Sequence, residues 1–366
     1  MTDTSKKLLA IRDRIDAIDD QVLALLSQRA NCAEEVAETK RAAGETDLCF
    51  YRPEREAQIL RRMSENNQGA LSNERITGIY REIISSCLAL EQCINVAFLG
   101  PEGTFSQEAV NKHFGHAVNV EPLSSIGQVF REVENGKADY GVVPIENSTE
   151  GVISYTLDVF MKSPLKISGE VKLRIHQNLL TNSLVNDDWK KVKKVYSHQQ
   201  SLAQCRQWLD INLPNAERIP VSSNTEAARQ AQNDNDAAAI AGSTAAKIYD
   251  LNIAQQNIED SKDNTTRFLV VGKQDVPPSG VDKTTLMISA KNRAGALYHL
   301  LAPLAENGLD MTRIESRPSQ NANWEYYFFM DINGHSQDEK VAKALADLEK
   351  EADLLRVLGS YPKAIL

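Results

Sequence analysis

The stretch that decides the fold spans residues 264–272 and reads Asn-Thr-Thr-Arg-Phe-Leu-Val-Val-Gly. Hydroxyl and guanidinium groups stand directly before a short apolar run that ends in glycine. Such a run predicts a buried strand, and reactive groups at the end of a rigid strand are well placed for chemistry. Because the linker-like stretch 276–280 (Val-Pro-Pro-Ser-Gly) follows closely, we interpret 264–272 as the last part of a catalytic body whose cleft is built by the chain before it.

The composition sets the first limits. A length of 366 residues predicts two or three domains, and 42% hydrophobic and 25% charged residues are ordinary values for a soluble protein. A net charge of −9 argues against nucleic acid as a partner but leaves room for an anionic small molecule where cationic groups gather. No apolar run is long enough to span a membrane, and the N-terminus lacks a signal peptide. We therefore expect a cytoplasmic protein without a membrane partner.

The cysteines and histidines predict neither disulfides nor a metal. Five cysteines are an odd number and none has CxxC spacing, which indicates free thiols in a reducing cytoplasm. They are Cys32, Cys49, Cys87, Cys93 and Cys205. The six histidines show no ligand spacing, so we expect no metal site and no cofactor.

One long helix is predicted from the N-terminus to about Lys40. Its apolar residues recur at alternating steps of three and four, as in a coiled-coil seam. These residues are Leu8, Ile11, Ile15, Ile18, Val22 and Leu25. Arg29 takes the next seam position, and Lys40 returns to nearly the same face about 16 Å further along the axis. Arg12 lies about 25 Å from Arg29 and is rotated off that face, so a site that uses all three would need Arg12 from a second chain.

Two more helices complete residues 1–94. The second begins near Arg52-Pro53, with proline in a favoured first-turn position, and carries Arg55 and Glu56. The third begins near Ser72, a suitable N-cap. It carries Cys87 and Glu91, which are four residues apart and so share a face.

These residues resemble the all-helical chorismate mutases, which are intertwined dimers. The resemblance implies that Arg29, Lys40, Arg55 and the partner's Arg12 bind the carboxylates and ether oxygen of chorismate, and that Glu56 accepts a hydrogen bond from the ring hydroxyl. The rearrangement is pericyclic and needs no nucleophile. Catalysis then consists of holding a compact conformer and stabilising charge on the breaking ether.

The chain departs from the mutase pattern at three positions. Arg52 stands where many of these enzymes carry an acidic residue, and Cys87 and Glu91 stand where Ser and Gln are common. A Gln amide can donate to the ether oxygen, whereas an ionised Glu cannot. We hypothesise that burial keeps Glu91 protonated. The alternative for residues 1–94 is a dimerisation module that has lost catalysis.

From residue 95 the chain alternates strands, polar loops and helices. Repeated units of this kind predict an α/β body with ligand-binding groups at the strand ends. The predicted strands and polar clusters lie at 96–106, 140–148, 194–199, 222–225 and 237–241. Taken singly, each cluster is more typical of a helix cap or a turn than of a site.

Taken together, the clusters resemble prephenate dehydratase over residues 95–273. The matching motifs are Gly-Pro-Glu-Gly-Thr-Phe-Ser at 100–106, Pro-Ile-Glu-Asn-Ser at 144–148, Ser-His at 197–198 with Gln204, and Thr-Arg-Phe at 266–268. The resemblance implies two α/β lobes, similar to periplasmic-type binding proteins, with the active site in the cleft between them.

The resemblance also implies roles for residues. Prephenate loses carbon dioxide and its ring hydroxyl as the ring becomes aromatic, so the enzyme must mainly help hydroxide leave, and a weak donor suffices. Thr266 is that donor, in preference to Glu146 or His198. Asn147, Ser197 and Gln204 are then hydrogen-bonding groups that position the substrate. For Arg267 two interpretations remain: a ligand of a substrate carboxylate, or a brace between the two lobes.

After a linker at 274–283, residues 284–366 predict a small α+β domain. Strands are expected at 284–288, 311–315, 324–332 and 354–358, with helices at 295–307 and 340–352. The order βαββαβ is the ferredoxin-like arrangement.

Two motifs in this last domain resemble the phenylalanine-binding motifs of ACT regulatory domains. The first is Gly295-Ala296-Leu297-Tyr298, with Tyr where Val or a similar residue is usual, and the second is Glu315-Ser316-Arg317-Pro318. Such domains pair side by side and bind the amino acid at their interface. The alternative is a plain dimerisation domain.

Together these resemblances predict a bifunctional enzyme that converts chorismate to prephenate and then to phenylpyruvate. L-Phenylalanine would inhibit it, and the chain would form a homodimer or a higher homo-oligomer. Two alternatives remain: a small-molecule sensor that keeps the cleft but not catalysis, and a dehydratase that prefers arogenate.

Overall fold

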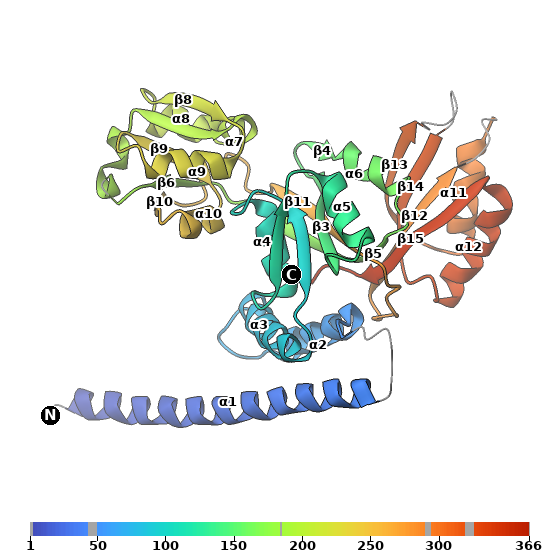
Figure 1. Ribbon diagram of the computed structural model, residues 1–366, viewed down its shortest axis with the longest axis horizontal. Helices are drawn as coiled ribbons and strands as arrows, with labels where there is room; N and C mark the ends of the chain where they lie inside the picture. The colour runs from blue at the N-terminus through green and yellow to red at the C-terminus, as the bar shows by residue number, and fades with distance from the viewer. Residues whose placement is uncertain (1–2, 43–49, 184, 290–293, 319–325, 366) are drawn as a thin grey trace.

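The computed structural model describes residues 3–42, 50–183, 185–289, 294–318 and 326–365. It contains three helices at the N-terminus, a two-lobed α/β body and a C-terminal α+β domain (Figure 1). The predicted fold class is confirmed.

The N-terminal domain consists of α1 (Asp3–Ala42), α2 (Pro53–Asn66) and α3 (Asn73–Glu91). The predicted starts hold: Pro53 opens α2, and the Ser72 hydroxyl accepts a hydrogen bond from the Arg75 amide at the start of α3. The C-terminal part of α1 lies beside α3, whereas its N-terminal half projects beyond both shorter helices (Figure 1). The apolar seam of that half is 48–63% exposed, so nothing in a single chain covers it.

The first lobe of the α/β body is built on a sheet with the order β2-β1-β3-β11-β5, and β4 pairs with β3. Its strands are β1 (Asn95–Leu99), β2 (Asn119–Leu123), β3 (Tyr140–Asn147), β4 (Gly151–Val152), β5 (Lys166–Arg174) and β11 (Thr265–Gly272). Its helices are α4 (Phe105–Phe114), α5 (Ile126–Glu134) and α6 (Ser154–Phe160). The strand predicted within residues 264–272 is β11, which runs antiparallel between β3 and β5. Its residues 268–271 are buried, as the apolar run predicted.

The second lobe has the strand order β10-β6-β9-β7-β8. Its strands are β6 (Asn178–Thr181), β7 (Lys194–His198), β8 (Glu217–Val221), β9 (Ala237–Ala241) and β10 (Asn252–Gln255). Its helices are α7 (Gln199–Gln204), α8 (Arg206–Asn212), α9 (Asn224–Gln232) and α10 (Ser243–Ile248), with a 3₁₀ turn η1 (Asn186–Lys191). The chain crosses between the lobes twice, from β5 to β6 and from β10 back to β11. Residues 175–177 and 256–264 are therefore the connections at the base of any cleft between the lobes.

The C-terminal domain has the predicted βαββαβ order and the antiparallel sheet β13-β14-β12-β15. Its elements are β12 (Asp282–Ser289), α11 (Ala296–Glu306), β13 (Met311–Pro318), β14 (Tyr326–Asn333), α12 (Glu339–Glu351) and β15 (Leu354–Pro362). Residues 324–325 of the predicted third strand lie outside the described residues. β15 packs against β5 of the first lobe. A Cβ at Gly359 would collide with the backbone of Ile167, so this close contact between domains requires glycine.

The helical domain also contacts the rest of the chain. The Arg61 guanidinium of α2 donates to the Ser279 hydroxyl at 3.1 Å and to the Val281 carbonyl at 2.8 Å. The Tyr51 hydroxyl lies 2.7 Å from His113 Nε2 on α4. Through these bonds the helical domain is fixed both to the first lobe and to the linker before β12.

Candidate active sites

A cavity of about 790 Å³ in the helical domain is the first candidate site. It lies between the C-terminal part of α1, α2 and α3, and Pro277 and Pro278 of the linker form part of its wall. Six residues proposed for the mutase site line this one cavity: Arg29, Lys40, Arg55, Glu56, Cys87 and Glu91. Residues that are up to 62 positions apart in the sequence therefore meet here.

Both carboxyl groups proposed for this cavity have raised pKa values. Burial raises the pKa of Glu56 to about 7, although Arg81 and Arg29 offset part of the effect. Burial also raises the pKa of Glu91, against the opposing charges of Lys40, Arg29 and Arg41. The direction of the Glu91 shift agrees with the hypothesis of a protonated donor. Lys40 Nζ lies 4.7 Å from the centroid of the Phe50 ring, which places the cation against an aromatic wall.

Arg12 and Arg52 differ in their position relative to this cavity. Arg12 lies on the exposed, projecting half of α1 and does not line the cavity of its own chain. This agrees with the helix geometry that would assign it to a second chain. Arg52 lines the cavity and forms a 2.6 Å ion pair with Glu54. Glu54, in the first turn of α2, therefore partly neutralises the charge of Arg52, the N-cap of that helix.

The second candidate site is a cavity of about 320 Å³ between the two lobes of the α/β body. Thr266, Asn147 and Gln204 line it, together with His198. A volume of this size is at the lower end for small-molecule sites. Thr266 stands near the start of β11 and Asn147 at the end of β3, and the two residues are direct partners in the β3–β11 register.

Asn147 fixes the Thr266 hydroxyl. Its side-chain oxygen accepts from the backbone N–H groups of Thr149 and Glu150, each at 3.0 Å. Its amide nitrogen therefore faces the other way and donates to Thr266 Oγ1 at 2.8 Å. Because the Thr266 oxygen accepts this bond, its own proton remains for a group in the cleft. Asn147 thus orients the proposed donor.

Ser197 lies behind the cleft rather than in its wall. It is fully buried, and its hydroxyl is 2.8 Å from the Ile240 carbonyl and 3.0 Å from Asn224 Oδ1. Asn224 does line the cleft. Ser197 therefore positions Asn224, and the expected direct role in substrate binding is corrected to an indirect one.

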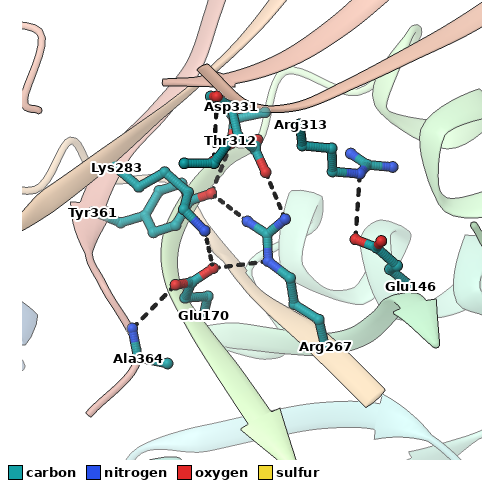
Figure 2. A network of polar contacts seen from close by, with 10 residues as sticks. Glu146, Glu170, Arg267, Lys283, Thr312, Arg313, Asp331, Tyr361 and Ala364 are labelled. Carbon is teal, nitrogen blue, oxygen red and sulfur yellow. Dashed lines mark hydrogen bonds and ion pairs between the residues drawn. The ribbon is translucent and has the colours of Figure 1, made fainter. Parts of the chain in front are cut away.

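Both interpretations of Arg267 are corrected by the structure. Successive residues of a strand point to opposite faces, so Arg267 faces away from the cleft that Thr266 lines. Its guanidinium donates to Glu170 at 2.7 Å, to Asp331 at 2.5 Å and to the Tyr361 hydroxyl at 3.0 Å (Figure 2). Asp331 and Tyr361 belong to the C-terminal domain. Arg267 therefore binds neither a substrate carboxylate nor the second lobe, but joins the first lobe to the C-terminal domain.

The surroundings of Arg267 form a buried ionic cluster. Lys283 Nζ also reaches Glu170, at 2.9 Å. Burial alone would raise the pKa of Glu170, but Arg267 and Lys283 outweigh it and hold this pKa below its usual value. A further ion pair between the same domains joins Arg313 to Glu146 at 3.4 Å (Figure 2). Glu146 and Arg267 each adjoin a cleft residue, Asn147 and Thr266.

Sequence reasoning gave no individual role to several residues of the cleft wall, although some lie in the polar clusters at 96–106 and 222–225 or in the stretch 264–272. They are amide and hydroxyl side chains: Thr104, Gln177, Gln200, Ser201, Ser222, Ser223, Asn224 and Asn264. Among the described residues that line the cleft, none is Lys, Arg, Asp or Glu. A capping signal, Ser223 followed by Glu226, was present in the sequence. Gln177 and Asn264 lie in the two crossovers and carry no comparable signal.

Helix N-termini supply positive potential to this uncharged wall. α4 begins beside Thr104, and α9 begins beside Ser223, whose hydroxyl accepts from the Glu226 amide. Both caps line the cleft. The free N–H groups and the dipole at a helix start favour an anion. The cleft can therefore bind carboxylates without a full positive charge.

The motifs of the C-terminal domain lie at its exposed side. Gly295 has a φ of 78° and precedes the first turn of α11, which contains Ala296, Leu297 and the 70% exposed Tyr298. Glu315 and Ser316 lie on β13, an edge strand of the sheet. Arg317 on the same strand binds Asp158 of α6 through bonds of 2.8 and 2.9 Å. It therefore ties the edge of this domain to the first lobe.

The described residues contain neither a cluster of metal ligands nor a helix suited to a membrane. No group of three or more His, Cys, Asp or Glu side chains there is arranged to hold a metal ion. Among the helices that the structure describes, none combines the length and apolar character needed to cross a membrane.

Comparisons with known families match all three parts of the chain. Residues 11–92 match the model of chorismate mutase type II, residues 96–276 that of prephenate dehydratase, and residues 284–350 that of the ACT domain. The matches follow the predicted order and confirm the three resemblances.

Individual relatives extend over the whole chain. Bifunctional chorismate mutase/prephenate dehydratases from Stutzerimonas stutzeri and Pseudomonas aeruginosa are 51% and 50% identical to it, each over 98% of this chain and 99% of the relative. Among solved structures, a prephenate dehydratase from Arthrobacter aurescens in complex with L-Phe superimposes with a TM-score of 0.68 at 35% identity. That match covers 74% of this chain and 90% of the other. The chain belongs to the family of bifunctional chorismate mutase/prephenate dehydratases.

Proposed function

We propose that the chain catalyses two consecutive steps of phenylalanine biosynthesis. The helical domain rearranges chorismate to prephenate, and the two-lobed body converts prephenate to phenylpyruvate. L-Phenylalanine, bound to the C-terminal domain, inhibits the enzyme. The observation that carries the proposal is the convergence of two separate sets of residues, a cationic set in the helical cavity and Asn147 with Thr266 in the cleft.

In the helical cavity the chemistry is one of positioning and charge. Arg29, Lys40 and Arg55 provide donors for the two carboxylates and the ether oxygen of chorismate. Charge that develops on that oxygen in the transition state is stabilised by fixed cations, an effect that is strong in a site shielded from water. A protonated Glu91 adds a neutral donor without the repulsion that a carboxylate would bring.

In the cleft the chemistry is the departure of two groups. The bond between the ring and its carboxylate breaks, its electron pair enters the ring, and carbon dioxide leaves. Hydroxide departs with the electron pair of the C–O bond and is neutralised by a proton from solvent. The Thr266 hydroxyl, oriented by Asn147, donates to the departing oxygen.

Regulation reaches the cleft through two of the interdomain ion pairs, Arg313–Glu146 and Arg267–Asp331. The strand β13 carries Glu315 and Ser316 of the ligand motif as well as Arg313, which contacts Glu146. Asp331 on the neighbouring β14 holds Arg267. Glu146 directly precedes Asn147, and Arg267 directly follows Thr266. A shift of this sheet on binding phenylalanine would therefore act on the strands that hold Asn147 and Thr266.

The chain works as a homodimer or a higher homo-oligomer in the cytoplasm. The exposed seam of α1 is a long apolar surface of the kind that a second α1 covers in a coiled coil. The partner's α1 would also bring Arg12 to the helical cavity. Among the described cysteines, Cys32, Cys87, Cys93 and Cys205 are all free thiols, which agrees with a reducing compartment.

One experiment tests the three parts of the proposal together. Chorismate is supplied to the purified protein, and chorismate, prephenate and phenylpyruvate are followed over time, with and without L-phenylalanine. We expect chorismate to be consumed, phenylpyruvate to accumulate, and phenylalanine to slow its formation. Binding of these ligands without turnover would support the sensor instead. A parallel reaction with arogenate tests that alternative substrate. Faster turnover of arogenate than of prephenate would contradict prephenate as the preferred substrate of the cleft.

A further inference from the structure

The side chain of Asn264 lies in the cleft beside Asn147 and Thr266, and the proposed function gives it no role. This residue lies in the second crossover between the lobes, directly before β11, and its side chain lines the cleft. It is 2% exposed. Its amide nitrogen has no hydrogen-bond partner among the described residues. A buried donor without a partner is costly to the fold, so its presence at a binding cleft indicates that a ligand accepts from it.

The orientation of this amide follows from its neighbours. The two backbone N–H groups of Thr149 and Glu150 require an oxygen, which fixes the Asn147 carbonyl toward them. The Asn147 nitrogen must then face Asn264, and it donates to Asn264 Oδ1 at 2.8 Å. An amide nitrogen in the place of that oxygen would leave two donors facing each other. The Asn264 NH₂ group therefore points away from Asn147.

Asn264 and Thr266 are bound to the same nitrogen. Asn147 Nδ2 lies 2.8 Å from Asn264 Oδ1 and 2.8 Å from Thr266 Oγ1. Two acceptors that share one amide nitrogen lie roughly 5 Å apart at ordinary hydrogen-bond lengths. The free Nδ2 of Asn264 belongs to the same amide group as that Oδ1, and Asn264 and Thr266 line the same cleft, so both side chains are near enough to contact one substrate. The Asn147 side chain thus holds two donors, a hydroxyl and an amide, at one end of the cleft.

We propose that Asn264 is a second donor to the hydroxyl group that leaves prephenate, beside Thr266. This inference rests on the proposed dehydratase function. As the C–O bond breaks, negative charge gathers on the departing oxygen, and two preorganised neutral donors stabilise it better than one. Asn264 therefore contributes more to the transition state than to the bound substrate. Its loss should lower kcat more than it raises KM.

Asn264→Asp is the sharpest variant. Aspartate keeps the oxygen that accepts from Asn147, and it lacks the donor when ionised but regains one when protonated. We expect the dehydratase kcat to fall about 100-fold near neutral pH with KM changed less than about threefold, in line with removal of one such donor. We also expect kcat to recover at least several-fold as the pH is lowered, after subtraction of the rate without enzyme. Asn264→Leu should lose activity without this recovery.

Two controls separate the role of a donor from loss of structure. Asn182→Asp makes the same chemical change at a buried amide of the second lobe whose nitrogen already donates to Asn235 at 2.9 Å, and it should keep kcat. Chorismate mutase activity of every variant reports on the rest of the chain. Activity that returns on acidification can come only from a folded cleft.

The outcomes distinguish this inference from the function on which it rests. If wild-type protein leaves prephenate unchanged, both the proposed function and the inference are overturned. If wild-type protein is active and Asn264→Asp retains kcat within threefold, the inference alone is overturned. A rise in KM with unchanged kcat, or pH profiles that are the same in the Asp and Leu variants, would also overturn it.

Discussion

The two proposed sites of this chain offer different groups to doubly negative substrates. The helical cavity is lined by Arg29, Lys40 and Arg55, with further arginines beside them. The cleft between the lobes is lined by amides, hydroxyls and helix N-termini, and its described wall contains no Lys or Arg. Both substrates carry two carboxylates, so net charge alone does not explain the contrast.

The difference follows from what happens to the carboxylates. In the rearrangement of chorismate both survive, and fixed cations can hold them and stabilise the developing ether charge together. In the conversion of prephenate one carboxylate must leave as neutral carbon dioxide. A close arginine would stabilise the charged ground state and raise the barrier, because only interactions that strengthen in the transition state accelerate a reaction. Neutral donors and helix dipoles bind the anion more weakly and avoid this penalty.

The largest effect is expected from removing a cation of the helical cavity. Lys40→Gln should lower the mutase kcat roughly 10³-fold, because a charged donor to the ether oxygen is worth more than a neutral one. Dehydratase activity with prephenate should not change. Lys191→Gln, at an exposed lysine of the second lobe, is the matched control. If the mutase kcat of the Lys40 variant falls less than tenfold, fixed charge is not what distinguishes the helical cavity from the cleft.

A smaller effect is expected from removing the neutral donor of the cleft. Thr266→Ala should lower the dehydratase kcat about 100-fold with little change in KM, and mutase activity should stay at the wild-type level. Thr266→Ser keeps the hydroxyl and should retain most of the activity. Thr265→Ala removes the neighbouring hydroxyl, which is not part of the cleft wall, and serves as the control. Turnover of Thr266→Ala near the wild-type rate would contradict the assignment.

The smallest effect concerns the pH dependence of the mutase. The raised pKa of Glu91 keeps its proton bound to a higher pH than in an exposed glutamate, and the donor is lost as the pH rises through that pKa. Mutase kcat/KM should therefore decline several-fold with rising pH, and Glu91→Gln should flatten this decline. Glu56, with a pKa of about 7, is assigned as an acceptor, so its ionisation should raise activity with rising pH, a limb of the opposite sign. If Glu91→Gln leaves the decline at higher pH unchanged, Glu91 is not the group responsible.

Much of the fold could be predicted because the signals were local. The apolar run of β11, the cap at Ser72 and the strand at 237–241 each depend on a few adjacent residues, and each lies where the sequence placed it. Helix spacing also indicated that Arg29 and Lys40 share a site. The same spacing set Arg12 apart, and in the structure Arg12 lies on the projecting half of α1.

The errors arose where a residue depends on a distant part of the chain. Arg267 follows Thr266 directly, but its role is decided by Glu170, Asp331 and Tyr361, which only the packing of the C-terminal domain brings together. Ser197 was expected to bind substrate by resemblance to the dehydratases, yet its hydroxyl is hydrogen-bonded to Asn224 behind the cleft wall. Asn264 could be assigned only after the hydrogen bonds of Asn147 were known.

The most direct test of two separate sites uses two inactive chains together. Lys40→Gln and Thr266→Ala proteins are purified separately, and each is supplied with chorismate alone and then in an equimolar mixture. The two cavities share no lining residue, so each variant should lack one step only. We expect little phenylpyruvate from either variant alone, accumulation of prephenate with Thr266→Ala, and phenylpyruvate from the mixture after a lag. A mixture that still forms no phenylpyruvate would contradict two independent sites joined by diffusible prephenate.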